Sequence, residues 1–203
     1  ASVAQMFGMR IDAFEASLDP GWLQRFSSRF APLGVDASAD CTHRFRLALF
    51  QALCGPVPHL RQLQVPAAHW SLQPRDALLP RLCAFALACR PGVIRSCVRR
   101  AARQSLEQML GPVYAMLRES ACGGAAVPSA VAERAPVDWA WVGYGDFVRG
   151  ALWPSRSMRR LVRLALPPAT KRGDWPALCK PEPHDPFQLM SEVDAWFGAA
   201  GQA

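Results

Sequence analysis

The sequence predicts an all-α protein. Its most regular stretch, residues 71–120, carries three successive sets of apolar residues at the spacing of one helix face. No segment alternates apolar and polar residues at the period of two that marks a half-buried strand. Proline, glycine and capping residues divide the remaining chain into pieces of helical length. We therefore expect packed helices and no sheet.

The central stretch predicts three short-linked helices. Their apolar sets are Leu78, Leu82, Phe85, Ala86 and Cys89; then Ile94, Cys97, Val98 and Ala101; then Leu106, Met109, Leu110, Val113, Tyr114 and Leu117. Pro80 should kink the first helix or delay its start. Ser105 and Gln108 have the spacing of a capping box that would open the third helix. Gly111-Pro112 interrupts a set that stays in phase, which favours a kink over two separate helices.

Three helices are predicted before this stretch. The first covers residues 4–18, and Asp19-Pro20 has the pattern of an N-cap followed by proline at the first helical position. Asp40 is the expected cap of the third helix, which Gly55-Pro56 should end. Residues 56–71 are interrupted by prolines, and we expect an irregular connection there with at most one helical turn.

The C-terminal part begins with a change of composition. Residues 121–136 consist mainly of small residues, glycine and proline, so a flexible loop without an apolar anchor is expected at about 121–136. Helices are predicted from 139 onwards, one of them over 155–165 and a last one opened by Asp185. The predicted organisation is a single compact domain over residues 1–203: a helical core at 4–120, the loop, and C-terminal helices at 139–198 packing back on the core.

Composition limits the class of protein. A chain of 203 residues with 51% hydrophobic residues can bury about 70% of its unfolded surface without disulfides or metal. No apolar run approaches the roughly 20 residues of a membrane span, and the start shows no secretory signal pattern. Seven cysteines, an odd number without a CxxC pair, favour buried free thiols. These features together predict a cytoplasmic protein.

Basic residues are the most notable polar feature. The net charge is +7, and only two of the 23 basic residues are lysines. One cluster contains Arg95, Arg99, Arg100 and Arg103, with Arg95, Arg99 and Arg103 expected on one helix face. A second, on the predicted 155–165 helix, contains Arg156, Arg159, Arg160 and Arg163. The first cluster suits a solvated helix end as well as an acidic partner. The second lacks interleaved acids and favours a contact surface.

Catalytic and metal-binding patterns are weak. Phosphate-binding loops, dinucleotide fingerprints, nucleophile elbows and HExxH are absent, and the cysteine spacings do not match zinc ligation. The four histidines are scattered, so a general base is not predicted. We expect no enzyme activity, no cofactor and no small-molecule substrate. Trp139 and Trp141, beside the predicted loop, are candidates for an interface anchor, although packing on the core explains them equally well.

Two stretches resemble a known family. The segment from Leu78 to Leu117, with Leu106, Leu110-Gly111 and Tyr114, is similar to the middle of the SctK family (relatives of YscK, PscK, MxiK and OrgA). These are accessory proteins of the sorting platform of bacterial type III secretion. The segment from Gly143 to Pro167 resembles a second block of that family. The matching positions there are Leu152, Pro154, Arg159, Arg160, Leu164, Leu166 and Pro167. Two departures are Ala165, where a lysine is expected, and a longer loop at 121–138.

The resemblance implies a non-enzymatic cytoplasmic adaptor of the injectisome, a virulence-associated machine. Its expected partners are an SctQ-like pod protein and the cytoplasmic domain of an SctD-like inner-ring protein. It would have no membrane span of its own and would be held at the inner membrane by the complex. The residues themselves leave a second hypothesis open, a basic helical protein that binds nucleic-acid phosphates through its arginine clusters, although no recognised nucleic-acid-binding motif is present.

Overall fold

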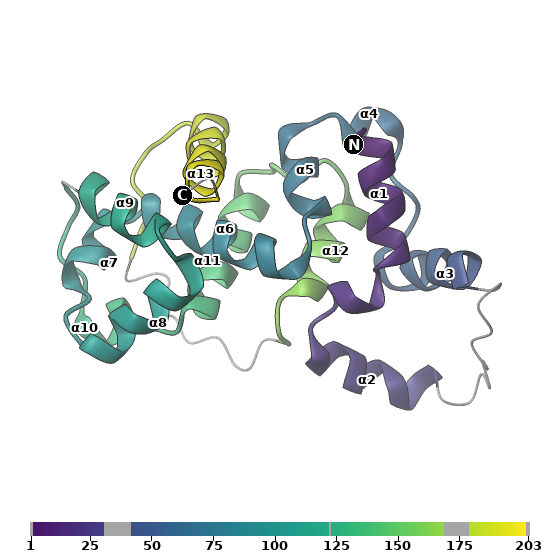
Figure 1. Ribbon diagram of the computed structural model, residues 1–203, viewed down its shortest axis with the longest axis horizontal. Helices are drawn as coiled ribbons and strands as arrows, with labels where there is room; N and C mark the ends of the chain where they lie inside the picture. The colour runs from purple at the N-terminus through teal and green to yellow at the C-terminus, as the bar shows by residue number, and fades with distance from the viewer. Residues whose placement is uncertain (1, 31–41, 122, 169–178, 202–203) are drawn as a thin grey trace. The chain divides into compact units, whose positions relative to one another are not determined.

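The fold is all-α in a computed structural model that describes residues 2–30, 42–121, 123–168 and 179–201 (Figure 1). No strand occurs in these ranges. The helices are α1 (Val3–Asp12), the 3-10 helix η1 (Glu15–Ser17), α2 (Pro20–Phe30), α3 (Thr42–Cys54), α4 (Leu60–Leu63), α5 (Pro66–Leu72), α6 (Arg75–Ala88), α7 (Pro91–Ser96), α8 (Arg100–Leu110), α9 (Val113–Ser120), α10 (Ser129–Ala132), α11 (Pro136–Arg149), α12 (Arg156–Ala165) and α13 (Pro186–Ala200). The predicted fold class is confirmed.

The chain forms two compact units. The first consists of Ala1–Leu78 and Ala151–Ala169, and the second of Leu79–Gly150 and Thr170–Ala203. Each unit is therefore built from two separate parts of the sequence. The single domain over residues 1–203 stays a prediction.

In the first unit, α12 packs among helices that precede it by more than 80 residues in the chain. Both α12 and α1 contact α3 and α5 (Figure 1). One core cluster consists of Ile11, Phe14, Leu18, Phe50, Cys54, Leu161 and Leu164. A second consists of Leu63, Ala68, Leu72 and Met158. Because α12 contributes to both clusters, burial of its apolar face fixes which of its residues face outwards.

Asp19 begins α2 as predicted. Its Oδ1 accepts a hydrogen bond from the Gly21 N–H (2.9 Å), and its Oδ2 accepts one from Arg75 Nη2 (2.7 Å). The Asp19 N–H donates to the carbonyl of Leu164 (2.9 Å), and Trp22 Nε1 donates to that of Leu166 (2.8 Å). The start of α2 is thus bonded to the end of α12. The predicted cap at Asp40 lies outside the described residues.

Two predictions for this unit are wrong. The first helix ends at Asp12 rather than near residue 18, and η1 follows it. The stretch 56–71 contains α4 and most of α5 instead of an irregular connection. Pro66 occupies the first turn of α5. Backbone N–H groups at this position make no hydrogen bond within the helix, so proline is tolerated there. Burial of Ala67, Ala68 and Trp70 stabilises this short helix.

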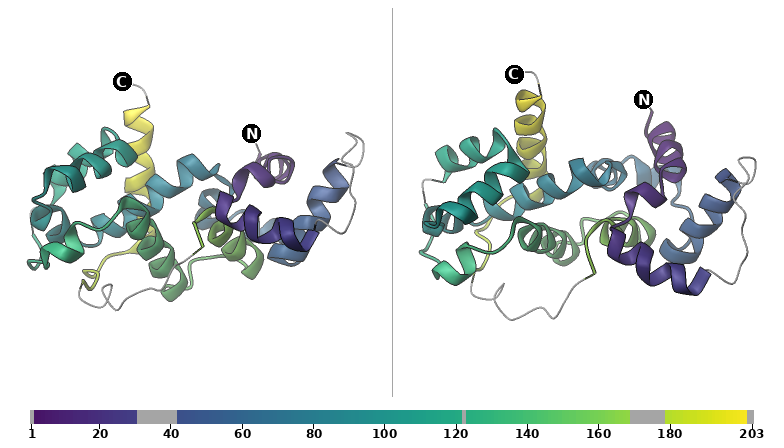
Figure 2. Two further views of the ribbon diagram at one scale, coloured as in Figure 1. Left: turned by 90° about the horizontal axis from the view of Figure 1, so that it is seen from below. Right: turned by 60° about the horizontal axis from the view of Figure 1, so that its bottom comes forward.

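The second unit is built around the buried residues of α6. Its side chains from Leu79 to Leu87 are buried on nearly every side, with only Pro80 and Arg81 partly exposed, so α6 is a core helix and not the one-sided helix predicted. Pro80 lies inside α6, which begins at Arg75 despite it. Helix α11 lies close to α6, since a Cβ on Gly143 would be 2.1 Å from the Leu82 carbonyl oxygen. Figure 2 shows α13 beside α9, which it contacts.

The expected boundaries between 90 and 120 are also corrected. Helix α7 ends at Ser96 and α8 begins at Arg100, so Ser105 lies inside α8 and does not cap a helix. Its hydroxyl donates to the Ala101 carbonyl one turn earlier (3.0 Å). Gly111 adopts φ 56° and ψ −137°, which a helix cannot continue, so α8 and α9 are two helices rather than one kinked helix.

The described residues 123–136 are anchored, contrary to the prediction of a loop without an apolar anchor. Gly123–Pro128 has no regular structure, but Ser129–Ala132 forms α10, in which Val131 and Ala132 are buried. The Val127 N–H donates to Ser96 Oγ (3.0 Å), and α10 packs on α7. A Cβ on Gly92 would lie 1.9 Å from the Ala125 carbonyl oxygen. The close approach of Ala125 to Gly92 and the burial of Val131 both contribute to anchoring this segment.

Candidate interaction surfaces

The predicted arginine face of the 155–165 helix is present in the first unit. Ser155 is the N-cap of α12, and its hydroxyl accepts from the Met158 N–H (3.2 Å). The buried side of the helix carries Met158, Leu161, Val162 and Ala165. The arginines lie on the other side and form what we call the α12 arginine surface: Arg156, Arg159, Arg160 and Arg163.

Three arginines of the α12 arginine surface are not paired with any acid in the part of the chain that the structure describes. Arg156 and Arg163 are exposed, and Arg159 and Arg160 are half-buried. Arg156, Arg159 and Arg160 make no ion pair with any residue that the structure describes. The Arg163 guanidinium carbon lies 5.8 Å from the centre of the Trp22 ring, within the range of a cation–π contact. Positive charge gathered on one helix face favours an acidic partner.

A buried arginine adds positive charge beneath this unit's surface. Arg10 of α1 is 4% exposed, and its Nε and Nη2 have no hydrogen-bond partner among the described residues. Burial lowers the pKa of Arg10 to about 10. Burial likewise raises the pKa of the Cys54 thiol to about 12, against the opposing influence of Arg160 and Arg10. Arg10 and Arg160 therefore lie near the same thiol, which stays protonated and supplies no counter-charge.

The first arginine cluster, in the second unit, is arranged differently from the prediction. Arg95, Arg99 and Arg103 do not share one helix face, because Arg95 is in α7, Arg99 is the N-cap of α8 and Arg103 is inside α8. Arg95 Nη1 donates to the Gly123 carbonyl (3.2 Å). Arg99 pairs with Glu133 (3.0 Å). The non-helical residues 97–99 between α7 and α8 separate arginines that a continuous helix would have aligned on one face.

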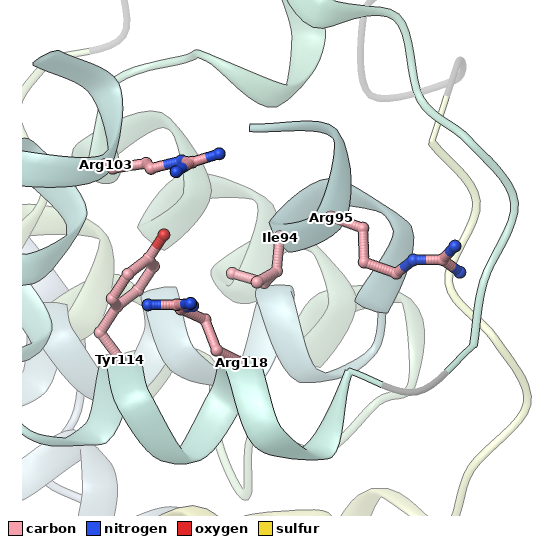
Figure 3. Close-up of a pocket in the computed structure, with 5 residues that line it drawn as sticks. All are labelled: Ile94, Arg95, Arg103, Tyr114 and Arg118. Carbon is pink, nitrogen blue, oxygen red and sulfur yellow. The ribbon is translucent and has the colours of Figure 1, made fainter. Parts of the chain in front are cut away.

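A pocket lies beside this cluster. Its volume is about 210 Å³, and it is lined by Ile94, Arg95, Arg103, Tyr114 and Arg118. In Figure 3 the Tyr114 hydroxyl points towards Arg103, the Arg118 guanidinium extends towards Tyr114, and the Arg95 guanidinium points away. Desolvation raises the pKa of Tyr114, with Cys97 adding to the rise and Arg103 and Arg118 opposing it. The phenol is therefore a protonated hydrogen-bond donor.

Sequence reasoning missed two of these residues. Tyr114 was assigned to the core and is indeed buried at 3% exposure, yet its hydroxyl faces the pocket. Arg118 follows Tyr114 by one helical turn on α9, a spacing that places the two side chains together. That i, i+4 pair was the available signal. Its proximity to Arg103 of α8 depends on the Gly111 turn and could not be read from spacing.

The two tryptophans proposed as interface anchors are in the core of the second unit. Trp139 is fully buried and Trp141 is 8% exposed, both in α11. Trp141 packs edge-on against Tyr144, with ring centres 5.5 Å apart. The structure thus shows the alternative that the sequence left open, packing of this segment onto the core.

Five cysteines are buried free thiols as predicted: Cys54, Cys83, Cys89, Cys97 and Cys179. Cys41 and Cys122 lie outside the described residues. Cys89 Sγ is 3.2 Å from His184 Nε2, a separation that resembles a nucleophile and base. However, burial followed by the charge of Asp146 raises the pKa of Cys89 to about 12, so the thiol is not activated.

Within the described ranges, metal-ligating side chains do not cluster and no helix is suited to span a membrane. Nowhere in them do three or more His, Cys, Asp or Glu side chains group so that they could hold a metal ion. Of the helices in those ranges, none has both the length and the apolar character needed to span a membrane.

The described residues define a helical protein with an arginine surface in one unit and an arginine-lined pocket in the other. A family model described as bacterial type III secretion protein (HrpB4) matches residues 1–183. The chain therefore belongs to the HrpB4 family of bacterial type III secretion proteins. No curated protein and no solved structure matches it. The predicted link to type III secretion is confirmed at the level of the secretion system.

Proposed function

We propose that this protein is an SctK-type adaptor of the type III secretion sorting platform. It would link an SctQ-like pod protein to the cytoplasmic domain of an SctD-like inner-ring protein at the cytoplasmic face of the inner membrane. Membership of a type III secretion family over residues 1–183 is the observation that carries this proposal. The resemblance of the central and C-terminal blocks to the SctK family gives the particular role.

The α12 arginine surface is the proposed contact with one of the two partners. It lies on a helix whose apolar face is buried, and Arg156, Arg159 and Arg160 make no ion pair with a described residue. Such a surface attracts an acidic partner and raises the rate of encounter. An adaptor of this kind works by binding and needs no catalytic group.

A pull-down with the pod protein and the inner-ring cytoplasmic domain tests the proposal. Replacing all four arginines of the surface by glutamate should weaken one of the two contacts while the far-ultraviolet circular dichroism spectrum stays unchanged. Binding of neither partner by the wild-type chain would refute the adaptor role. Unchanged binding by the fourfold variant would remove the α12 arginine surface from it.

A matched pair of double variants separates position from charge. Arg156→Glu with Arg163→Glu alters the two exposed members of the surface. Arg44→Glu with Arg61→Glu makes the same charge change at exposed positions on α3 and α4 of the same unit. We expect the first pair to weaken the contact and the second to leave it nearly unchanged. Equal effects would indicate only general charge attraction.

The nucleic-acid hypothesis is tested with the same proteins. Binding through several phosphates would be strong at low salt and would fall by decades as the salt concentration rises. We expect no such binding to generic DNA. Tight, salt-sensitive binding that the fourfold variant loses would favour the nucleic-acid role instead.

A further inference from the structure

We propose that the pocket between α7, α8 and α9 binds the carboxylate of an acidic side chain in a partner protein. The inference rests on the proposed function only in taking a protein as the ligand. Its site belongs to the second unit, whereas the α12 arginine surface belongs to the first.

The pocket presents three groups that donate hydrogen bonds. Arg118 is exposed and forms no ion pair or hydrogen bond with a described residue. Arg103 donates from Nε to the Cys97 carbonyl (2.7 Å), which fixes the guanidinium and leaves its two terminal nitrogens available. The Tyr114 hydroxyl points towards Arg103, and the Arg118 guanidinium extends towards Tyr114 (Figure 3). Two guanidinium groups and a phenol form a set of donors that a carboxylate satisfies well.

Among the residues that the structure describes, no acid occupies this position. Glu107 is close enough to influence the pKa of Tyr114, as the weakest of its neighbours, but it makes no ion pair with Arg103 or Arg118. Glu133 is paired with Arg99 instead. The positive charge in the pocket is thus left for a ligand from outside.

Shape favours a single side chain over a nucleic-acid backbone. A hollow of about 210 Å³ with the apolar side chain of Ile94 in its lining suits the methylene and carboxylate groups of Glu or Asp. A nucleic-acid strand needs a basic track that follows successive phosphates. The neighbouring arginines do not extend such a track, because Arg95 is bonded to Gly123 and Arg99 to Glu133.

The test is an NMR titration of the full chain with a capped peptide of the sequence Ala-Leu-Glu-Leu-Ala. The control ligand is the same peptide with Gln in place of Glu. We expect the Glu peptide to shift the side-chain N–H signals of Arg103 and Arg118 and to bind several-fold more tightly than the Gln peptide. Arg118→Gln should weaken binding of the Glu peptide roughly fivefold. This loss of affinity lies between that expected for an exposed ion pair and that expected for a hydrogen bond to a charged group.

Arg100→Gln is the matched variant, since Arg100 is an exposed arginine of α8 that does not line the pocket. It should leave the affinity unchanged. Tyr114→Phe, which removes only the hydroxyl, should weaken binding less than Arg118→Gln. Inorganic phosphate and a ten-nucleotide oligothymidine are titrated in parallel.

Four outcomes would overturn the proposal. These are no shift with the Glu peptide, equal affinity for the Glu and Gln peptides, equal losses for Arg118→Gln and Arg100→Gln, and preferred binding of oligothymidine or phosphate. The peptide experiment uses no secretion partner, so its failure leaves the adaptor function standing. Failure of the pull-down likewise leaves the pocket result unaffected.

Discussion

The buried ion pair between Arg90 and Asp146 should be the most sensitive polar feature of the second unit. Arg90 is the N-cap residue of α7 and Asp146 lies in α11, and their side chains are 2% and 9% exposed. Arg90 Nη1 and Nη2 donate to the two carboxylate oxygens of Asp146 at 2.8 and 3.0 Å. We predict that Asp146→Asn destabilises the protein strongly.

The magnitude follows from what the substitution leaves behind. Arg90 Nε still donates to the Cys179 carbonyl (2.8 Å) and Nη1 to that of Ala86 (3.1 Å), so the guanidinium stays in its buried position. Its charge then lacks a counter-ion. Removing one partner of a buried pair typically costs about 3–5 kcal/mol, because the other charge remains desolvated. Arg149 also bonds to Asp146, but this contact is near the surface. Its loss should add little to the destabilisation.

Urea unfolding followed by circular dichroism measures this cost. Asp194→Asn is the matched control, because Asp194 pairs with Arg81 in the same unit but is 44% exposed. It should cost at most about 1 kcal/mol. The double variant Arg90→Met with Asp146→Leu should lower the free energy of unfolding clearly less than the summed effects of Arg90→Met alone and Asp146→Leu alone. The reason is that the double variant leaves no unpaired buried charge. Asp146→Asn costing no more than Asp194→Asn would refute the reasoning.

Two further predictions concern packing and pH. Gly143→Ala should destabilise the protein by about 1–3 kcal/mol, because its Cβ would meet the Leu82 backbone oxygen at 2.1 Å. Gly198→Ala has open space around its Cβ and should stabilise the protein by up to about 1 kcal/mol. Thermal unfolding of both variants checks this, and equal effects would contradict it. The free energy of unfolding should also fall as the pH rises above 9.0, the unperturbed pKa of a thiol. In the folded protein the pKa of Cys54 and that of Cys89 are raised to about 12, so both thiols keep their protons. The unfolded chain releases these protons above pH 9.0, which favours unfolding. Urea unfolding at successive pH values up to about 10 measures this loss, which a Cys54→Ala, Cys89→Ala variant should show less steeply.

The sequence by itself determined the fold class and the local character of several elements. Helical spacing and the absence of strand alternation depend only on which residues are neighbours along the chain, and both predicted an all-α protein. The caps at Asp19 and Asp185 were equally readable, since a capping side chain bonds to backbone groups two or three residues away. The α12 arginine surface followed from the same local periodicity, because one helix carries both its apolar and its basic face.

Only the tertiary structure decided which residues from different helices meet. The Gly111 turn brings Arg118 and Tyr114 of α9 to Arg103 of α8, and no spacing rule predicts a backbone conformation at one glycine. The break at 97–99 likewise scattered arginines that a continuous helix would have aligned. The partners of Arg90 are 56 and 89 residues away in the chain. Local patterns fix how a helix presents its side chains, whereas long-range packing selects the turns, and the turns decide which side chains form a site.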